Sequence, residues 1–160
     1  MREIHLIDTS IFCRILRVPG LCSTEEHEQA LAELSDLLAK SEVTLLLPVA
    51  TIYETGNHIA QNGTGDVRRK AAQRFAEQVR QALEGTAPWR PTPLPALAQM
   101  TEWLGDFPTW ATTGVGLGDL SIIAVFKDQQ ALNPYARIRI WSADSHLASY
   151  DYRPTGSLLP

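Results

Sequence analysis

Four carboxylates stand beside apolar runs, where a strand is expected to end or a helix to begin. The first run starts at Ile4 and leads directly into an acid and two hydroxyl residues. In a parallel α/β sheet the carboxyl ends of the strands lie along one edge, and ligands bind at that edge. We therefore expect four acidic side chains to gather there: Asp8, Glu54, Asp119 and Asp144.

Carboxylates held together repel one another and take up protons unless a cation keeps them ionised. Hard divalent ions with oxygen ligands, Mg²⁺ or Mn²⁺, suit such a set. One ion activates a water, and a second stabilises the leaving oxygen about 3.5–4 Å away, so phosphodiester hydrolysis needs no side-chain nucleophile. Hydroxyls that orient ligands or water are expected at Thr9, Ser142 and Ser145.

These residues also allow other interpretations. Asp8 can simply cap the helix that follows it, because Asp is a favoured N-cap residue. A phosphatase with an aspartate nucleophile is disfavoured because position 10 is Ser, where a second Asp is needed. A Ser-His-Asp hydrolase built from Asp144, Ser145 and His146 is disfavoured because adjacent residues cannot form the relay and no G-x-S-x-G elbow is present.

Hydrophobic periodicity predicts the elements that position the acids. Buried strands are expected up to Asp8, at Val43–Leu47 and, by alternation, at Arg137–Trp141. Helices are expected through Ile11–Leu16, from a capping box at Ser23 and Glu26 to Leu38, from Val49 to Ile59, from a cap at Asp66 to Gly85, over Leu94–Leu104, and from Asp119 to Phe126, with a short one through Leu147.

Two segments are expected to be irregular. The span Ala87–Pro95 holds four prolines and is interpreted as a stiff connection within one domain. Phe107, Trp110 and the glycines of Gly114–Gly118 are expected to form a loop. That loop lacks both the dinucleotide fingerprint and the lysine of a P-loop, so it is a flexible approach to the next helix and not a phosphate cradle.

Positive residues that can contact a phosphate backbone lie on several predicted helices. The cluster Arg68-Arg69-Lys70, close to a glycine hinge, is the leading candidate, although a charged helix face is commonly just solvated. Further candidates for contact with RNA are Arg14, Arg17 and His146.

Composition limits the class of protein. The chain has 160 residues, which suits a single domain over residues 1–160 with helices on both sides of a sheet. A formal charge of −4 argues against an overall electrostatic grip on nucleic acid, although a local basic patch or a bound cation can reverse it. Cys13 and Cys22 are expected to be free thiols. No signal peptide or membrane span is recognised, so the cytoplasm is the expected location.

Four segments together resemble the PIN-domain family, above all its VapC-type toxins. They are LIDTSIF, PVATIYETGNHI, GLGDLSIIAVF and IWSADSHLASYD, and the similarity spans nearly the whole chain. The resemblance implies a three-layer α/β/α sandwich with a central, mainly parallel sheet. It also implies that Asp8, Glu54, Asp119 and Asp144 are the catalytic metal ligands, and that Ser142 is the hydroxyl residue usual at the end of the last strand. The chain departs from the compact family pattern between Glu54 and Asp119, where it is long and proline-rich.

The expected function is accordingly an Mg²⁺- or Mn²⁺-dependent endoribonuclease, the toxin of a type II toxin–antitoxin pair. The resemblance implies RNA as substrate, a cognate antitoxin as partner and a homodimer. The alternative is a PIN-fold module that binds RNA or protein without cleaving. Ile11, Phe12, Ile15 and Leu21 either line a groove for an antitoxin segment or belong to the core.

Overall fold

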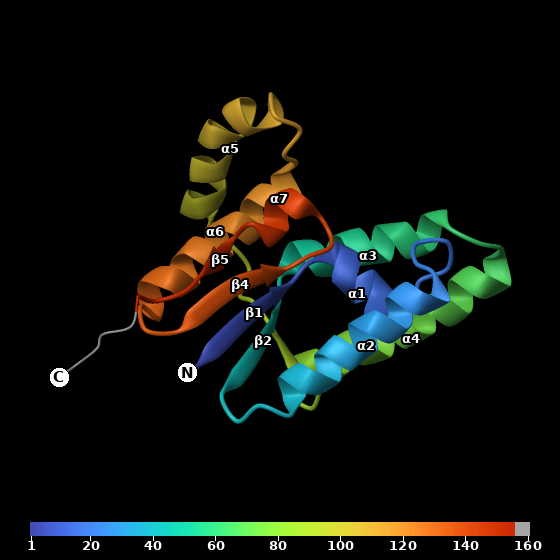
Figure 1. Ribbon diagram of the computed structural model, residues 1–160. Helices are drawn as coiled ribbons and strands as arrows, with labels where there is room; N and C mark the ends of the chain where they lie inside the picture. The colour runs from blue at the N-terminus through green and yellow to red at the C-terminus, as the bar shows by residue number, and fades with distance from the viewer. Residues whose placement is uncertain (156–160) are drawn as a thin grey trace.

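The computed structural model describes residues 1–155, in which five strands form one sheet (Figure 1). The strand order is β3-β2-β1-β4-β5, and every neighbouring pair is parallel except β4 with β5. The strands are β1 (Glu3–Ile7), β2 (Val43–Leu47), β3 (Trp89–Pro91), β4 (Arg137–Trp141) and β5 (Asp151–Tyr152). The helices are α1 (Thr9–Ile15), α2 (Thr24–Leu38), α3 (Val49–Gln61), α4 (Gly65–Glu84), α5 (Leu97–Ala111), α6 (Leu117–Leu132) and α7 (Ser145–Ala148).

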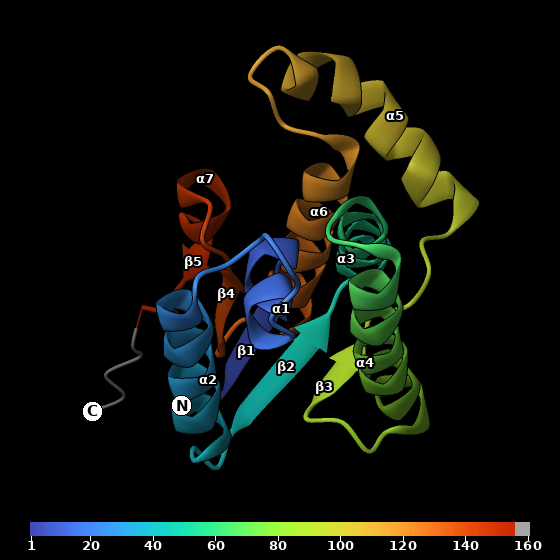
Figure 2. The ribbon, with the colours of Figure 1, turned by 90° about the vertical axis from the view of Figure 1, so that its right-hand side faces the viewer.

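Helices cover both faces of the sheet, which gives the expected three-layer α/β/α sandwich with a mainly parallel sheet. Helices α1, α2 and α4 lie on one face, and α6 and α7 lie on the other (Figures 1 and 2). Helix α3 begins directly after β2 and packs against α1, α4 and α6. None of the helices in residues 1–155 is both long enough and apolar enough to cross a membrane.

Alternation along the strands divides the core into two layers, because successive strand side chains point to opposite faces. On β1, Ile4 and Leu6 pack with α6, whereas Ile7 packs with α1 and α2. Central strands buried on both faces read as continuous apolar runs. This pattern made β1 and β2 recognisable in the sequence, whereas β4 was recognisable by its alternation of arginine and apolar residues; the predicted positions of all three are confirmed.

The proline-rich segment contains an edge strand that the sequence analysis did not predict. Residues Trp89–Pro91 pair in parallel with β2, and the amide of Thr92 donates to the carbonyl of Leu47 at 3.0 Å. Proline lacks an amide proton and is tolerated at a sheet edge, where one side of the strand needs no partner. Trp89 is only 3 % exposed and anchors this strand in the core.

Helix α5 is longer than predicted, since it continues through Phe107, Pro108 and Trp110 to Ala111 instead of ending in a loop. Trp103, Phe107 and Trp110 follow a spacing of four and three residues, so the apolar face continues past the proline. The prediction that the helix ends at Leu104 and that Phe107 and Trp110 lie in a loop was wrong, because the helix continues through Pro108 despite the backbone hydrogen bond that a proline lacks.

The cap of α4 also differs from the prediction. Thr64 is the N-cap and accepts a hydrogen bond from the amide of Val67. Asp66 lies inside the first turn, where a negative charge is favourable beside the positive end of the helix dipole. Its carboxylate pairs with Arg69 at 2.8 Å and with Lys70 at 3.0 Å. Gly85 ends the helix in the left-handed conformation, as expected.

Candidate active site

All four predicted carboxylates line one cavity of about 350 Å³ at the carboxyl edge of the sheet: Asp8, Glu54, Asp119 and Asp144. Each comes from a different element junction. Asp8 follows β1, Glu54 lies in the second turn of α3, Asp119 lies in the first turn of α6, and Asp144 follows β4. The parallel topology therefore gathers residues that are far apart in the chain.

Asp8 is the most buried of the four, with 5 % of its surface exposed. Its Oδ2 accepts hydrogen bonds from the hydroxyls of Ser10 at 2.8 Å and Ser142 at 2.7 Å. Those hydroxyls in turn accept from the backbone amides of Ala143 at 2.9 Å and Asp144 at 3.0 Å. The network joins the end of β1 to the end of β4 and fixes the Asp8 carboxylate.

Asp8 is also the N-cap of α1, so the capping interpretation is correct as well. The cap uses Oδ2, which accepts from the amide of Ser10 at 3.4 Å. Within residues 1–155, no hydrogen bond reaches Oδ1, and Asp8 lines the cavity. One carboxylate oxygen is thus held by the protein while the other remains available to a ligand.

Glu54 is held from two sides. The hydroxyl of Thr9 donates to its Oε2 at 2.7 Å. On the other side, the backbone of α6 approaches so closely that a Cβ on Gly118 would overlap Oε1 and lie 3.1 Å from Cδ. Gly118 precedes Asp119, so the absence of a side chain at position 118 lets the two acids approach.

The pKa of Asp119 is raised by its surroundings in the site. Burial raises the pKa of Asp119, and the charges of Asp8, Glu54 and Asp144 raise it further. A hydrogen bond from the backbone of Gly116 acts in the opposite direction. Like charges close enough to perturb one another form the kind of group that a cation stabilises.

Asp144 and Ser145 lie at the exposed rim of the site. The Asp144 carboxylate caps α7 by accepting from the amide of Leu147 at 2.9 Å. Ser145 was predicted to orient ligands. Its side chain is exposed and makes no hydrogen bond within the described residues.

The donor types suit Mg²⁺ or Mn²⁺, because all four side chains offer carboxylate oxygens. In residues 1–155, however, no three or more His, Cys, Asp or Glu side chains are placed so that they could hold a metal ion together. Residues of the right chemistry surround the cavity, but their side chains do not form a ready-made coordination set.

The predicted RNA contacts are scattered. Arg14 lines the acidic cavity and pairs with Glu26 at 3.0 Å. Arg17 lies outside it and donates to Thr24. The cluster Arg68-Arg69-Lys70 is exposed on α4 and does not line the cavity.

His146, the remaining predicted RNA contact, is exposed on α7. Its ring lies 6.4 Å from that of Trp110 and 5.6 Å from that of Tyr150. It does not line the acidic cavity.

Sequence reasoning missed four residues of the site, namely Ser10, Cys13, Gly118 and His58. Ser10 had a usable signal, because it follows Asp8 by two residues at the start of a helix. Gly118 had none, since its role depends on the approach of α6 to α3. Cys13 is a free thiol whose pKa burial raises to about 11.

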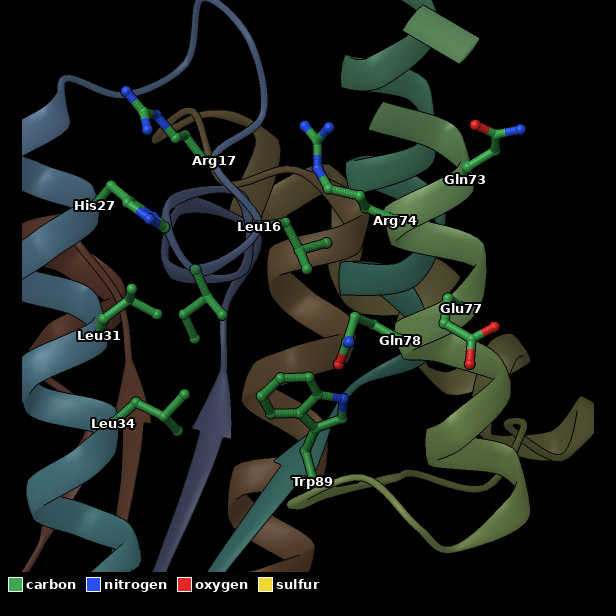
Figure 3. Close-up of a pocket in the computed structure, with 11 residues that line it drawn as sticks. Leu16, Arg17, His27, Leu31, Leu34, Gln73, Arg74, Glu77, Gln78 and Trp89 are labelled. Carbon is green, nitrogen blue, oxygen red and sulfur yellow. The ribbon is translucent and has the colours of Figure 1, made fainter. Parts of the chain in front are cut away.

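A larger open groove of about 870 Å³ lies between α1 and α2 on one side and α4 on the other (Figure 3). Leu16, Leu31, Leu34 and Trp89 give it apolar walls (Figure 3). None of the four acids lines it.

The residues proposed for an antitoxin groove are mostly core. Ile11 and Phe12 of α1 are 5 % and 0 % exposed and pack in the core, so they cannot line a docking surface. Ile15 lines the large groove, and Leu21 lines the acidic cavity. Besides Ile15 and Leu16, the apolar surface of this groove comes from Leu31 and Leu34 of α2 and Trp89 of β3, which the sequence analysis did not assign to it.

The crystal structure of FitAcB from Neisseria gonorrhoeae is similar to this chain. The two align with a TM-score of 0.55 over 91 % of each chain, at 16 % sequence identity. The fold is PIN-like. No family model and no curated protein sequence matches the chain. At this identity the likeness concerns the fold, and function has to be inferred from the site.

Proposed function

We propose that this protein is a metal-dependent endoribonuclease that hydrolyses RNA phosphodiester bonds at the carboxyl edge of its sheet. The observation that carries the proposal is the convergence of four carboxylates on one cavity, where burial and then the charges of Asp8, Glu54 and Asp144 raise the pKa of Asp119. Mutual repulsion of this kind is costly, and a titratable group in a cleft whose pKa is shifted by burial and by neighbouring charges is a candidate for a functional site.

Asp8, Glu54, Asp119 and Asp144 would hold Mg²⁺ or Mn²⁺ in this site. A bound divalent ion supplies an activated water for attack on the phosphodiester. Ser10 and Ser142 hold the Asp8 carboxylate by its Oδ2, so Oδ1 would be available to bind the ion. Thr9 holds the Glu54 carboxylate by donating to its Oε2. The cavity side chains have to move together on binding, because their positions in the structure do not yet form a coordination set.

The lack of a ready-made coordination set favours a second candidate function, a PIN-fold module that binds RNA or protein without cleaving it. We prefer the nuclease because the hydroxyl network immobilises Asp8 in a buried position. A binding surface alone gains nothing from a buried, rigid carboxylate next to three others.

Cleavage of structured RNA by the purified protein tests the two candidates. We expect hydrolysis with Mg²⁺ or Mn²⁺, none with a chelator, and none with Asp8→Asn. The matched control is Asp128→Asn, which neutralises an exposed acid farther along the same helix as Asp119. RNA binding without cleavage by the wild type, at any divalent ion concentration, would favour the non-catalytic module.

We further propose that the nuclease acts as a homodimeric toxin in the cytoplasm and is neutralised by an antitoxin. The resemblance to VapC-type toxins supports this, and the open groove of α1, α2 and α4 offers an apolar surface for a protein segment (Figure 3). Expression should stop growth, and co-expression of the neighbouring small gene product should restore it. Leu31→Glu, at an exposed groove position, should weaken the complex without reducing cleavage.

A further inference from the structure

A second cavity, of about 510 Å³, adjoins the acidic cavity. Glu54 lines both cavities, and Gly118, next to Asp119, lines the second. Helix α5 forms one wall where it packs on α6 and extends away from the sheet (Figures 1 and 2). A group in this cavity that contacts Glu54 and Gly118 therefore lies at the edge of the acidic cavity.

The walls of this cavity are aromatic and apolar. Tyr53 of α3 is 66 % exposed, and Trp103 of α5 is half-buried. Met100 and Leu94 extend the apolar wall and are also exposed. Contiguous exposed apolar surface on a folded protein marks a binding site more commonly than scattered apolar residues do.

The polar groups of the cavity are few and nearly all neutral. Glu54 is the one charged side chain among its lining residues, and no Lys, Arg or His of residues 1–155 lines it. Ser121 donates its hydroxyl proton to the carbonyl of Gly118 at 2.6 Å and can still accept a hydrogen bond. Thr92 accepts from the amide of Val49 at 3.3 Å and can still donate. The cavity thus suits a flat, uncharged ring with edge donors and acceptors, and it does not suit a phosphate.

We propose that this cavity binds one unpaired base of the RNA, next to the scissile phosphate, by stacking on Tyr53 and Trp103. The inference rests on the proposed nuclease function and adds a substrate requirement to it. Aromatic rings stack on any base, whereas a base inside a duplex is already stacked between its neighbours. The site therefore selects loops or single strands over paired RNA.

Charge argues against a second copy of this chain as the occupant. The charged residues of α5 are Glu102 and Asp106, with no basic residue on the helix. A two-fold contact through α5 would set two acidic helices against each other, beside two acidic cavities.

An abasic scan of an oligoribonucleotide substrate tests the proposal. A single abasic nucleotide is placed at each position flanking the cleavage site, and kcat/KM is measured for wild type, Tyr53→Ala and Trp103→Ala. At one flanking position, base removal should lower wild-type kcat/KM by roughly 5- to 100-fold, the range of one stacked base. Tyr53→Ala should lower kcat/KM for the intact RNA by a similar factor. Removing the base from the RNA should then lower the kcat/KM of this variant little further.

Three variants separate stacking from other causes. Tyr53→Phe keeps the ring and should retain activity, whereas Tyr53→Leu keeps only apolar bulk and should behave like Tyr53→Ala. Tyr135→Ala removes an 84 % exposed aromatic ring outside this cavity and should change nothing. The proposal would be overturned if removing the base lowered kcat/KM by the same factor in the wild type and in Tyr53→Ala. It would also be overturned if Tyr53→Ala changed the sedimentation coefficient, because Tyr53 would then lie in a contact between two copies of the chain. Failure of the wild type to cleave any RNA would instead refute the nuclease function.

Discussion

Glu54 fits against the backbone of Gly118 so closely that even a methyl group at position 118 would overlap its carboxylate. The contact joins α3 to the first turn of α6 and brings Glu54 towards Asp119. The geometry of the candidate site thus depends on a residue with no chemical function of its own.

Gly118→Ala should therefore impair the site without unfolding the protein. The new Cβ displaces the Glu54 carboxylate from its hydrogen bond with Thr9. We expect RNA cleavage to fall about 10- to 100-fold, the usual effect of disturbing a group that orients a metal ligand. Gly105→Ala is the matched control, because Gly105 is also a helical glycine and a Cβ added there would have nothing within 4 Å. Equal activity of the two variants would contradict the role of Gly118.

Ser10→Ala and Ser142→Ala should each lower cleavage about 10- to 100-fold by releasing the Asp8 carboxylate. Ser145→Ala should have no effect, since this exposed hydroxyl has no hydrogen-bond partner in residues 1–155. Steady-state cleavage rates at saturating Mn²⁺ compare the three variants. A loss in Ser145→Ala as large as that in Ser142→Ala would show that the rim of the site, and not the hydroxyl network, orients the ligands.

Asp119→Asn should stabilise the protein in a chelating buffer at neutral pH. Burial and the three neighbouring acids raise the pKa of Asp119, so its ionised form is less favourable in the folded state than in the unfolded chain. Removing the charge should raise Tm, with about 2–4 °C expected for each kcal/mol gained. Divalent ions should then stabilise the wild type more than the variant. A lower Tm for Asp119→Asn in chelator would contradict electrostatic crowding.

His5 should be neutral down to a low pH. It is 1 % exposed, accepts from Arg139 at 2.6 Å and lies 2.9 Å from Glu3. Burial, and then the charge of Arg139, lower the pKa of His5 to about 4. Because the unfolded chain binds this proton more readily, the stabilising contribution of neutral His5 is complete above about pH 6.5 and is lost as the pH falls towards 4. NMR titration, with His5→Gln to assign the resonance, should show this low pKa, and a midpoint near 6.5 would refute it.

The parts of the fold recognisable from sequence were those with strong periodicity. Val43–Leu47 was placed correctly because it is a run of β-branched residues and leucines, and Arg137–Trp141 because its apolar residues alternate with arginines. The three-residue strand Trp89–Pro91 was not predicted, because its proline is acceptable only at a sheet edge, and which segment forms the edge depends on the partner strand.

The acids of the candidate site were identifiable because Asp8 and Asp144 follow strands and because Glu54 and Asp119 lie within the first two turns of helices. Their relative positions were not, since hydrogen bonds such as that of Ser142 to Asp8 join residues more than a hundred positions apart. The convergence of carboxylates follows from topology, whereas the orientation of each one depends on tertiary contacts that no local pattern encodes.

Binding of Mn²⁺ is the most direct test of the central claim that these four carboxylates form a cation site. Electron paramagnetic resonance of free Mn²⁺ during titration measures it without requiring activity. We predict saturable binding to the wild type and to Asp128→Asn, and loss of that binding in Asp8→Asn and Asp119→Asn. No saturable binding to the wild type, or equal binding by Asp8→Asn, would contradict the account.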